Sequence, residues 1–87
     1  MIDVLTTKNY NKSFKKKDEF VQNKAIERIK LFRRDPFNIL LNNHALTGEH
    51  KDERSFNVTG DYRIIFYHIN KNTVILLDIG THAELYG

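Results

Sequence analysis

The apolar residues of the N-terminal half recur at helical spacing. In the longer of two such segments these residues are Val21, Ala25, Ile29 and Phe32. Residues three or four positions apart share one face of a helix. A shorter segment places Tyr10 four positions before Phe14, and the polar run "KKKDE" separates the two segments. We therefore predict a short first helix and a longer second one.

Both ends of the longer helix carry a recognisable signal. Asp18 is suited to be its N-cap, because a short carboxylate side chain can accept from the free N–H groups of a first helical turn. Arg33 and Arg34 suit the last turn electrostatically. Pro36, the only proline, disfavours helical geometry at Asp35. The helix is predicted to begin after Asp18 and to end before Pro36.

The C-terminal half is rich in β-branched and aromatic residues. The runs "RSFNVT", "YRIIFYHI" and "TVILLDIG" are separated by the turn signals "GD" and "NKN", which predicts an antiparallel meander of three strands. The run "IDVL" near the start of the chain is a further short strand. Together these elements predict a single α+β domain over residues 1–87. Its N-terminal strand completes a curled, mainly antiparallel four-stranded sheet, and two helices pack on one face of that sheet.

Arg63 is the exception within its strand. Side chains alternate between the two faces of a sheet, so Arg63 shares a face with Ile65 and Tyr67. Burying an unpaired guanidinium costs several kcal/mol. We therefore expect Arg63 to meet an acidic side chain or to open into a cleft where an anion can bind.

The charge is distributed unevenly along the chain, although the net charge is only +3. Residues 1–40 carry ten Lys and Arg against five Asp and Glu, a balance of +5, and residues 41–87 carry four against six, a balance of −2. The basic half is either a solvated helix face or a surface for a polyanion or an acidic partner protein.

Composition excludes several other classes of protein. The chain has no cysteine, so disulfides and thiolate metal sites are ruled out. No run reaches the roughly 18 apolar residues of a membrane span, and "MIDVLTTKNY" lacks the regions of a signal peptide. These observations predict a soluble protein of the cytoplasm.

Residues that can carry chemistry gather near strand ends and loops of the second half. They are His44, His50, Asp61, Arg63, His82 and Tyr86. The histidine spacing does not match a zinc site, and no P-loop, dinucleotide or nucleophile-elbow motif is present. Histidine transfers protons near neutrality, arginine binds phosphate, and an aromatic ring stacks on an unpaired base. The set suits acid–base cleavage of a phosphodiester.

The alternatives are that His82 caps the last strand at the surface and that His44 is a turn residue. His50 receives no role.

Three segments, in order, resemble the toxins of the RelE/ParE superfamily, and most closely its YafQ-like branch. They are "HALTG", "RSFNVTGDYRIIFYHI" and "VILLDIGTHAELYG". The segment "IERIKLFRRDPF" is similar to the second helix of that family. The resemblance implies the toxin of a type II toxin–antitoxin module, a ribosome-dependent mRNA endonuclease. In that family the RNA 2′-hydroxyl attacks the adjacent phosphate without a metal or cofactor. It also implies three partners, namely a cognate antitoxin, the ribosome and mRNA.

The resemblance assigns roles residue by residue. His82 matches the terminal histidine of proton transfer, and Tyr86 the aromatic that positions the substrate base. Asp61 matches the acid at the strand turn. Arg63 matches the arginine that RelE and YoeB place against the scissile phosphate. His44 matches the histidine of the first motif, and we predict that it is the general base.

Two further basic residues, Lys51 and Arg54, are predicted to bind RNA.

The chain also departs from the YafQ pattern, which has an acid and a histidine where Ser55 and Asn57 stand. Loss of such groups predicts weaker catalysis. Two alternatives therefore stay open. One is a ParE-like toxin that poisons DNA gyrase without chemistry, and the other is a catalytically weak member kept for antitoxin binding.

Overall fold

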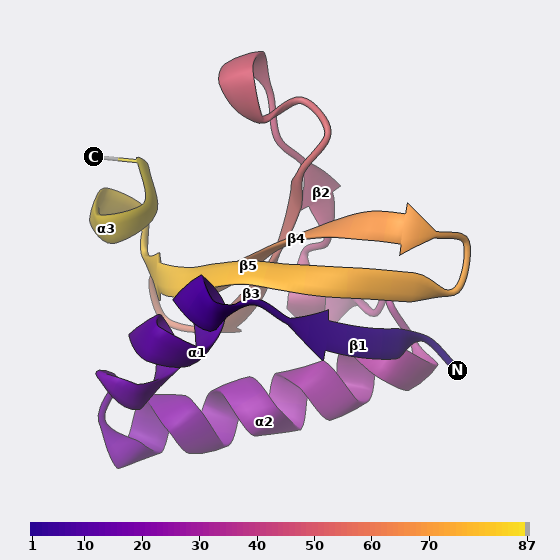
Figure 1. The fold of residues 1–87 in the computed structure, drawn as a ribbon. Helices are drawn as coiled ribbons and strands as arrows, with labels where there is room; N and C mark the ends of the chain where they lie inside the picture. Colours follow the sequence, from indigo (N-terminus) through magenta and orange to yellow (C-terminus); the bar gives the residue numbers. More distant parts are fainter. Residues whose placement is uncertain (87) are drawn as a thin grey trace.

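A computed structural model describes residues 1–86 of the chain (Figure 1). Its elements are β1 (Asp3–Thr6), α1 (Lys8–Lys15), α2 (Glu19–Arg34), the 3-10 turn η1 (Ile39–Leu41), β2 (His44–Ala45), the 3-10 turn η2 (Gly48–His50), β3 (Arg54–Thr59), β4 (Tyr62–Asn70), β5 (Thr73–Thr81) and α3 (His82–Tyr86). No helix in this part of the chain is both long and apolar enough to cross a membrane.

The strands form one mixed sheet in the order β1-β5-β4-β3-β2. Strand β1 pairs with β5 in parallel, and the other pairs are antiparallel. The α+β class and the N-terminal strand are confirmed, but the predicted curled sheet of four strands is corrected to an open sheet of five. The additional strand, β2, is only two residues long. Its residues His44 and Ala45 pair with Ser55 and Arg54 of β3. A pair this short leaves no alternation in the sequence.

The predicted pair of N-terminal helices is confirmed, and both lie on one face of the sheet (Figure 1). The Asp18 carboxylate accepts from the backbone N–H of Val21 at 2.9 Å, which makes Asp18 the N-cap of α2. At the other end Asp35 is the C-cap, immediately before Pro36. The local signals at both ends of α2 therefore act as expected.

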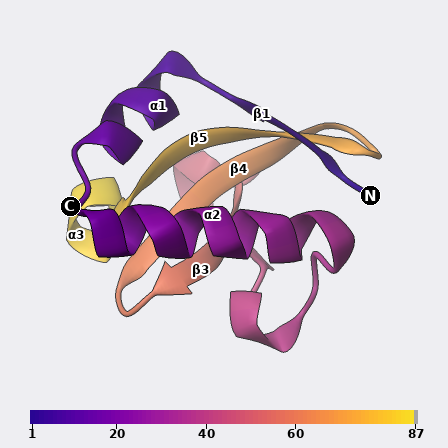
Figure 2. The same ribbon diagram turned by 90° about the horizontal axis from the view of Figure 1, so that it is seen from below.

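The core lies between α2 and the sheet, where α2 runs across the strands (Figure 2). Phe32 of α2 stacks on Phe56 of β3 with ring centroids 4.7 Å apart, and meets Phe66 of β4 edge-on at 4.9 Å. All three rings are fully buried. Aromatic pairs at these distances add specific contact energy to the burial of apolar surface, so this cluster holds the helix layer against the central strands.

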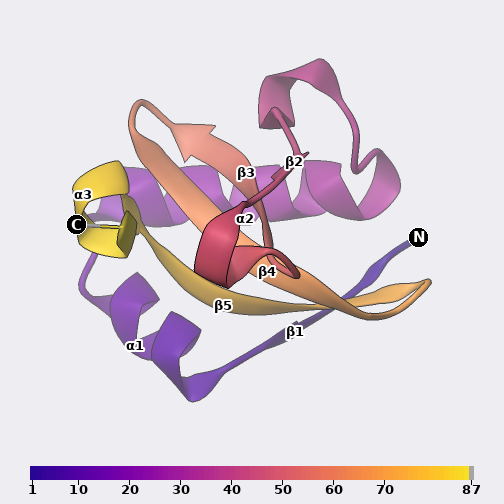
Figure 3. The same cartoon turned by 90° about the horizontal axis from the view of Figure 1, so that it is seen from above.

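The opposite face of the sheet carries the segment from β2 to η2 and the helix α3 (Figures 1 and 3). Helix α3 was not expected from the sequence, which predicts the strand "TVILLDIG" but no helix after it. Gly80 allows this helix to lie close to the sheet, because a Cβ at Gly80 would stand 3.1 Å from the Glu84 Cβ. One face of the sheet thus packs against the helices to form the core, and the other face carries the candidate site.

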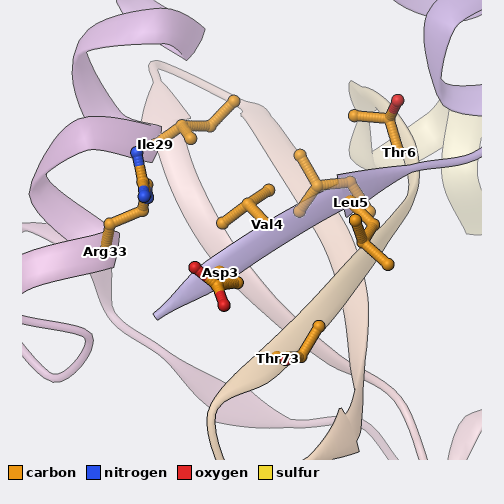
Figure 4. Close-up of a pocket in the computed structure, with 8 residues that line it drawn as sticks. Asp3, Val4, Leu5, Thr6, Ile29, Arg33 and Thr73 are labelled. Carbon is orange, nitrogen blue, oxygen red and sulfur yellow. The ribbon is translucent and has the colours of Figure 1, made fainter. Parts of the chain in front are cut away.

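A hollow of about 610 Å³ lies between β1 and α2. Its lining includes Val4 and Leu5 of β1 and Ile29 and Arg33 of α2, and in Figure 4 Val4 points from the strand toward α2. The Arg33 Nε donates to the carbonyl of Ile2 at 2.9 Å, so its guanidinium is engaged in tying the helix to the strand. This hollow shares no residue with the cleft described next.

Candidate active site

A cleft of about 230 Å³ lies on the sheet face that carries η2 and α3. Its lining comes from five places in the fold: His44 in β2, Leu46 and Thr47 before η2, His50 in η2, Arg63 in β4, and His82 and Tyr86 in α3. Four of the five residues predicted to be catalytic therefore line one cleft. The fifth, Asp61, lies in the turn between β3 and β4 and contacts two groups of this site.

Arg63 lies in the central strand β4, in register with Asn57 on one side and Gly80 on the other. Its Nη2 is 3.3 Å from the Asp61 Oδ1, and 22% of its side chain is exposed. Its Nε is buried and has no hydrogen-bond partner within residues 1–86. Either an acidic partner or an opening into a cleft was expected for Arg63, and the structure shows both. A partly exposed guanidinium that lines a cleft is a binding group for an anion.

Helix α3 begins with a reciprocal cap. The Thr81 hydroxyl accepts from the Glu84 backbone N–H at 3.2 Å, and the Glu84 Oε1 accepts from the Thr81 N–H at 2.8 Å. This is the capping-box arrangement. The Lys17 ammonium adds an ion pair to Glu84 at 3.1 Å. The hydrogen bond from the Thr81 N–H, together with Lys17, lowers the pKa of the Glu84 carboxyl. The cap and the ion pair hold α3, and with it the rest of its side chains, over the sheet.

His82 and Tyr86 lie one helical turn apart on α3, with ring centroids separated by 4.8 Å. The Asp61 Oδ2 accepts from the His82 backbone N–H at 3.2 Å, while its Oδ1 faces Arg63. Asp61 therefore joins the start of α3 to the guanidinium. The Tyr86 hydroxyl is buried without a hydrogen-bond partner in residues 1–86, so the ring rather than the hydroxyl is what the residue offers to the cleft.

His44 is held by the main chain. Its Nδ1 is 2.8 Å from the carbonyl oxygen of Asn42. A carbonyl only accepts, so Nδ1 carries the hydrogen and Nε2 is left as an acceptor. Strand β2 places His44 opposite Ser55, whose hydroxyl is buried without a partner in the described chain.

His50 is the ionisable residue of the cleft to which the sequence gave no role. Its Nδ1 is 3.0 Å from the Glu53 Oε1, and its ring meets that of Tyr86 edge-on with centroids 6.1 Å apart. The loop carrying His50 has no periodic pattern, so only its path in space brings the residue to the cleft. The spacing His-x-x-Glu was the one available signal, because a turn closed by a hydrogen bond from the Glu53 N–H to the His50 carbonyl, 2.8 Å, brings residues three apart together.

The two predicted RNA-binding residues lie outside the lining of the cleft. The Arg54 Nε donates to the Asn43 side chain at 2.9 Å, and its guanidinium lies 5.7 Å from the centre of the Phe37 ring. Lys51 is exposed directly after η2. Within residues 1–86 no three His, Cys, Asp or Glu side chains are grouped so as to hold a metal ion.

Comparison with known proteins identifies one family. Residues 2–87 match the family described as bacterial toxin of type II toxin-antitoxin system, YafQ. The chain belongs to the YafQ toxin family. The resemblance to this branch of the RelE superfamily is thereby confirmed, and the protein is a toxin of the type II class. No curated protein matches the chain.

Solved structures of YafQ toxins share the whole fold. YafQ from E. coli strain BL21(DE3) is 22% identical and superposes with a TM-score of 0.80, covering 100% of both chains. The toxin of the E. coli DinJ-YafQ toxin-antitoxin complex is 26% identical with a TM-score of 0.78, over 99% of this chain and 98% of that one. A YoeB/ParE toxin from Agrobacterium tumefaciens, 16% identical over 93% of this chain and 99% of its own, shares the fold at a TM-score of 0.76.

Proposed function

We propose that this YafQ-family toxin is a ribosome-dependent mRNA endonuclease that inhibits translation by metal-independent acid–base cleavage. One observation carries the proposal. The Arg63 guanidinium, whose side chain is 22% exposed, shares a cleft of about 230 Å³ with three imidazoles and a tyrosine ring. RNA cleavage requires a group that binds the phosphate, groups that transfer protons and a ring that stacks on the base. The cleft contains a residue for each of these roles.

The reaction is a transfer within the RNA chain. The 2′-oxygen attacks the adjacent phosphorus, the bond from phosphorus to the 5′-oxygen breaks, and the products are a 2′,3′-cyclic phosphate and a 5′-hydroxyl. Arg63 binds the phosphate and meets the charge that develops on its oxygens. His82 gives a proton to the leaving 5′-oxygen, and an imidazole from His44 or His50 takes the 2′-hydroxyl proton. Tyr86 stacks on the base, and Asp61 orients Arg63 and α3.

The rest of the basic surface serves the RNA and the ribosome in this proposal. Lys51 and Arg54 contact the RNA backbone beyond the cleft, and the Lys-rich first half of the chain lies along ribosomal RNA. Because the substrate is a translated messenger, the toxin acts in the cytoplasm.

A cognate antitoxin is the second proposed partner, since an E. coli YafQ toxin of the same fold is described in complex with DinJ. Strand β1 has a free edge beside the 610 Å³ hollow, and Leu5 on it is half exposed. An extended antitoxin segment can add to such an edge. Leu5→Asp should weaken neutralisation by the antitoxin while toxicity stays intact; unchanged neutralisation would place the antitoxin elsewhere.

Induced expression tests the enzymatic proposal. We expect growth arrest, with new 5′ ends of messengers inside translated codons and none when translation is blocked beforehand. Arg63→Ala and His82→Ala should abolish cutting, because they remove the phosphate ligand and the acid. His68→Ala, at an exposed position of β4 outside the cleft, is the matched control.

The alternatives give different results in the same cells. DNA-damage signalling with intact transcripts favours a ParE-like gyrase poison. Harmless overexpression points to a weak member kept for antitoxin binding. Equal cutting by wild type, Arg63→Ala and His82→Ala refutes the proposed roles of both residues.

A further inference from the structure

A carboxylate–imidazole pair that the sequence left without a role lies at the cleft, with the imidazole in the lining and the carboxylate beside it. It consists of Glu53 and His50, with Oε1 and Nδ1 3.0 Å apart. We propose that His50, oriented by Glu53, is the general base that takes the 2′-hydroxyl proton. This inference rests on the proposed RNA cleavage and names a catalytic residue for it.

The turn that carries the pair keeps both side chains together. The His50 backbone N–H donates to the Thr47 carbonyl at 3.3 Å, and the Glu53 N–H donates to the His50 carbonyl at 2.8 Å. Both side chains remain partly open to solvent, with 42% of His50 and 29% of Glu53 exposed. The imidazole is therefore fixed by the turn and still reachable by a substrate in the cleft.

Glu53 decides which nitrogen of His50 is available. An ionised carboxylate only accepts hydrogen bonds, so Nδ1 carries the hydrogen and donates it to Glu53. The lone pair of Nε2 is then free to take a proton. When it does, the positive charge on the ring is met by the carboxylate, which is the task of the acid that supports a catalytic histidine.

The other two imidazoles of the cleft lack this support. His44 has the same tautomer, but its Nδ1 faces the neutral carbonyl of Asn42. The His82 ring has no hydrogen-bond partner within residues 1–86; only its backbone N–H is engaged, with Asp61. Of the three, His50 alone has a charged group placed to stabilise the protonated ring. Its ring also meets that of Tyr86, the proposed stacking surface for the base beside the scissile bond.

The proposed step balances without any further reactant. The His50 Nε2 takes the proton of the 2′-hydroxyl as the 2′-oxygen bonds to phosphorus. The bond from phosphorus to the 5′-oxygen breaks, and that oxygen receives a proton from the His82 imidazolium. Solvent then returns one proton to His82 and removes one from His50.

Single-turnover cleavage of a messenger on translating ribosomes by the purified toxin tests the assignment. His50→Gln should slow cleavage by a factor on the order of 10² to 10⁴, the usual range for the loss of an acid–base group. His44→Gln should lose clearly less, and His68→Gln should be unchanged. A circular dichroism spectrum and melting curve for each variant show that it is folded.

A substrate with sulfur in place of the leaving 5′-oxygen separates base from acid. Sulfur leaves without being protonated, so this substrate should restore cutting by His82→Gln but not by His50→Gln. Glu53→Gln, which keeps an acceptor for Nδ1 but no charge, should slow cleavage less than Glu53→Ala. A smaller loss of rate in Glu53→Gln than in Glu53→Ala is expected if Glu53 orients His50. If Glu53 only held the turn in place, both variants would instead show a folding defect.

The outcomes separate this inference from the function on which it rests. Should His50→Gln cut at the wild-type rate while Arg63→Ala is inactive, His50 is not the base and the endonuclease proposal stands. If the sulfur substrate restores cutting by His50→Gln, His50 is the acid and the assignment is overturned. A wild-type toxin that leaves messengers whole overturns both proposals.

Discussion

Tyr10 is the residue whose replacement most directly tests the packing of the core. Its side chain is 4% exposed, and its hydroxyl is buried without a hydrogen-bond partner in residues 1–86. Burial disfavours the charged phenolate and raises the pKa of Tyr10 from 10.0 to about 12. We expect Tyr10→Phe to be at least as stable as the wild type at neutral pH, because an unsatisfied buried hydroxyl costs about 1 to 3 kcal/mol.

The same burial predicts how the stability responds to alkali. The unfolded chain ionises Tyr10 near its ordinary pKa of 10.0, whereas the folded chain holds the proton until about pH 12. The stabilisation is therefore complete below pH 10 and is lost as the pH rises toward 12. At about 1.4 kcal/mol for each pH unit, the loss is about 2 to 3 kcal/mol. This is a large share of the roughly 4 to 13 kcal/mol expected for a chain of this length.

Urea unfolding followed by circular dichroism, repeated from about pH 7 to about pH 11.5, measures this effect. The difference in free energy of unfolding between wild type and Tyr10→Phe should be constant up to pH 10 and should then grow in favour of the variant. Tyr67→Phe, at an exposed position of β4, is the matched control for removal of a phenol. Parallel curves for wild type and Tyr10→Phe would mean that burial does not raise the pKa of Tyr10. A variant clearly less stable at neutral pH would mean that the hydroxyl has a partner. Either result would refute the reasoning.

Two further predictions concern the anchoring of α3. In Gly80→Ala the new Cβ would stand 3.1 Å from the Glu84 Cβ. Overpacking should lower the free energy of unfolding by about 1 to 3 kcal/mol. Because the contact also pushes on α3, toxicity should fall by more than the loss of stability explains. Denaturation curves and growth assays check both, and full toxicity would show that α3 need not stay where it is. The lowered pKa of Glu84 contributes stability that is present above its ordinary value of 4.5 and lost as the pH falls below it. Glu84→Gln should remove that acid-dependent part, and an unchanged acid profile would contradict the role of the Lys17 ion pair.

Local signals in the sequence were sufficient for most of the fold. Helix α2 begins after Asp18 and ends before Pro36 because both residues act on the backbone beside them. The three long strands follow the runs of β-branched and aromatic residues between turn signals. Arg63 was recognisable as a site residue from strand alternation alone, since a charge in a central strand needs an acid or an opening.

The tertiary structure alone decided how the parts of the site come together. Strand β2 is too short to leave a period. Helix α3 starts with a local Thr-x-x-Glu cap, but its ion pair joins residues 67 positions apart, Lys17 and Glu84. His50 reaches the cleft by the path of a loop. Spacing along a chain reports only which neighbours share a face of one element. Contacts between distant elements depend on how the chain closes on itself, and no local pattern records that. The sequence by itself therefore determined the two N-terminal helices, the long strands and the residue types of the candidate site, and the packing of α3 and η2 over one sheet face decided which of those residues meet.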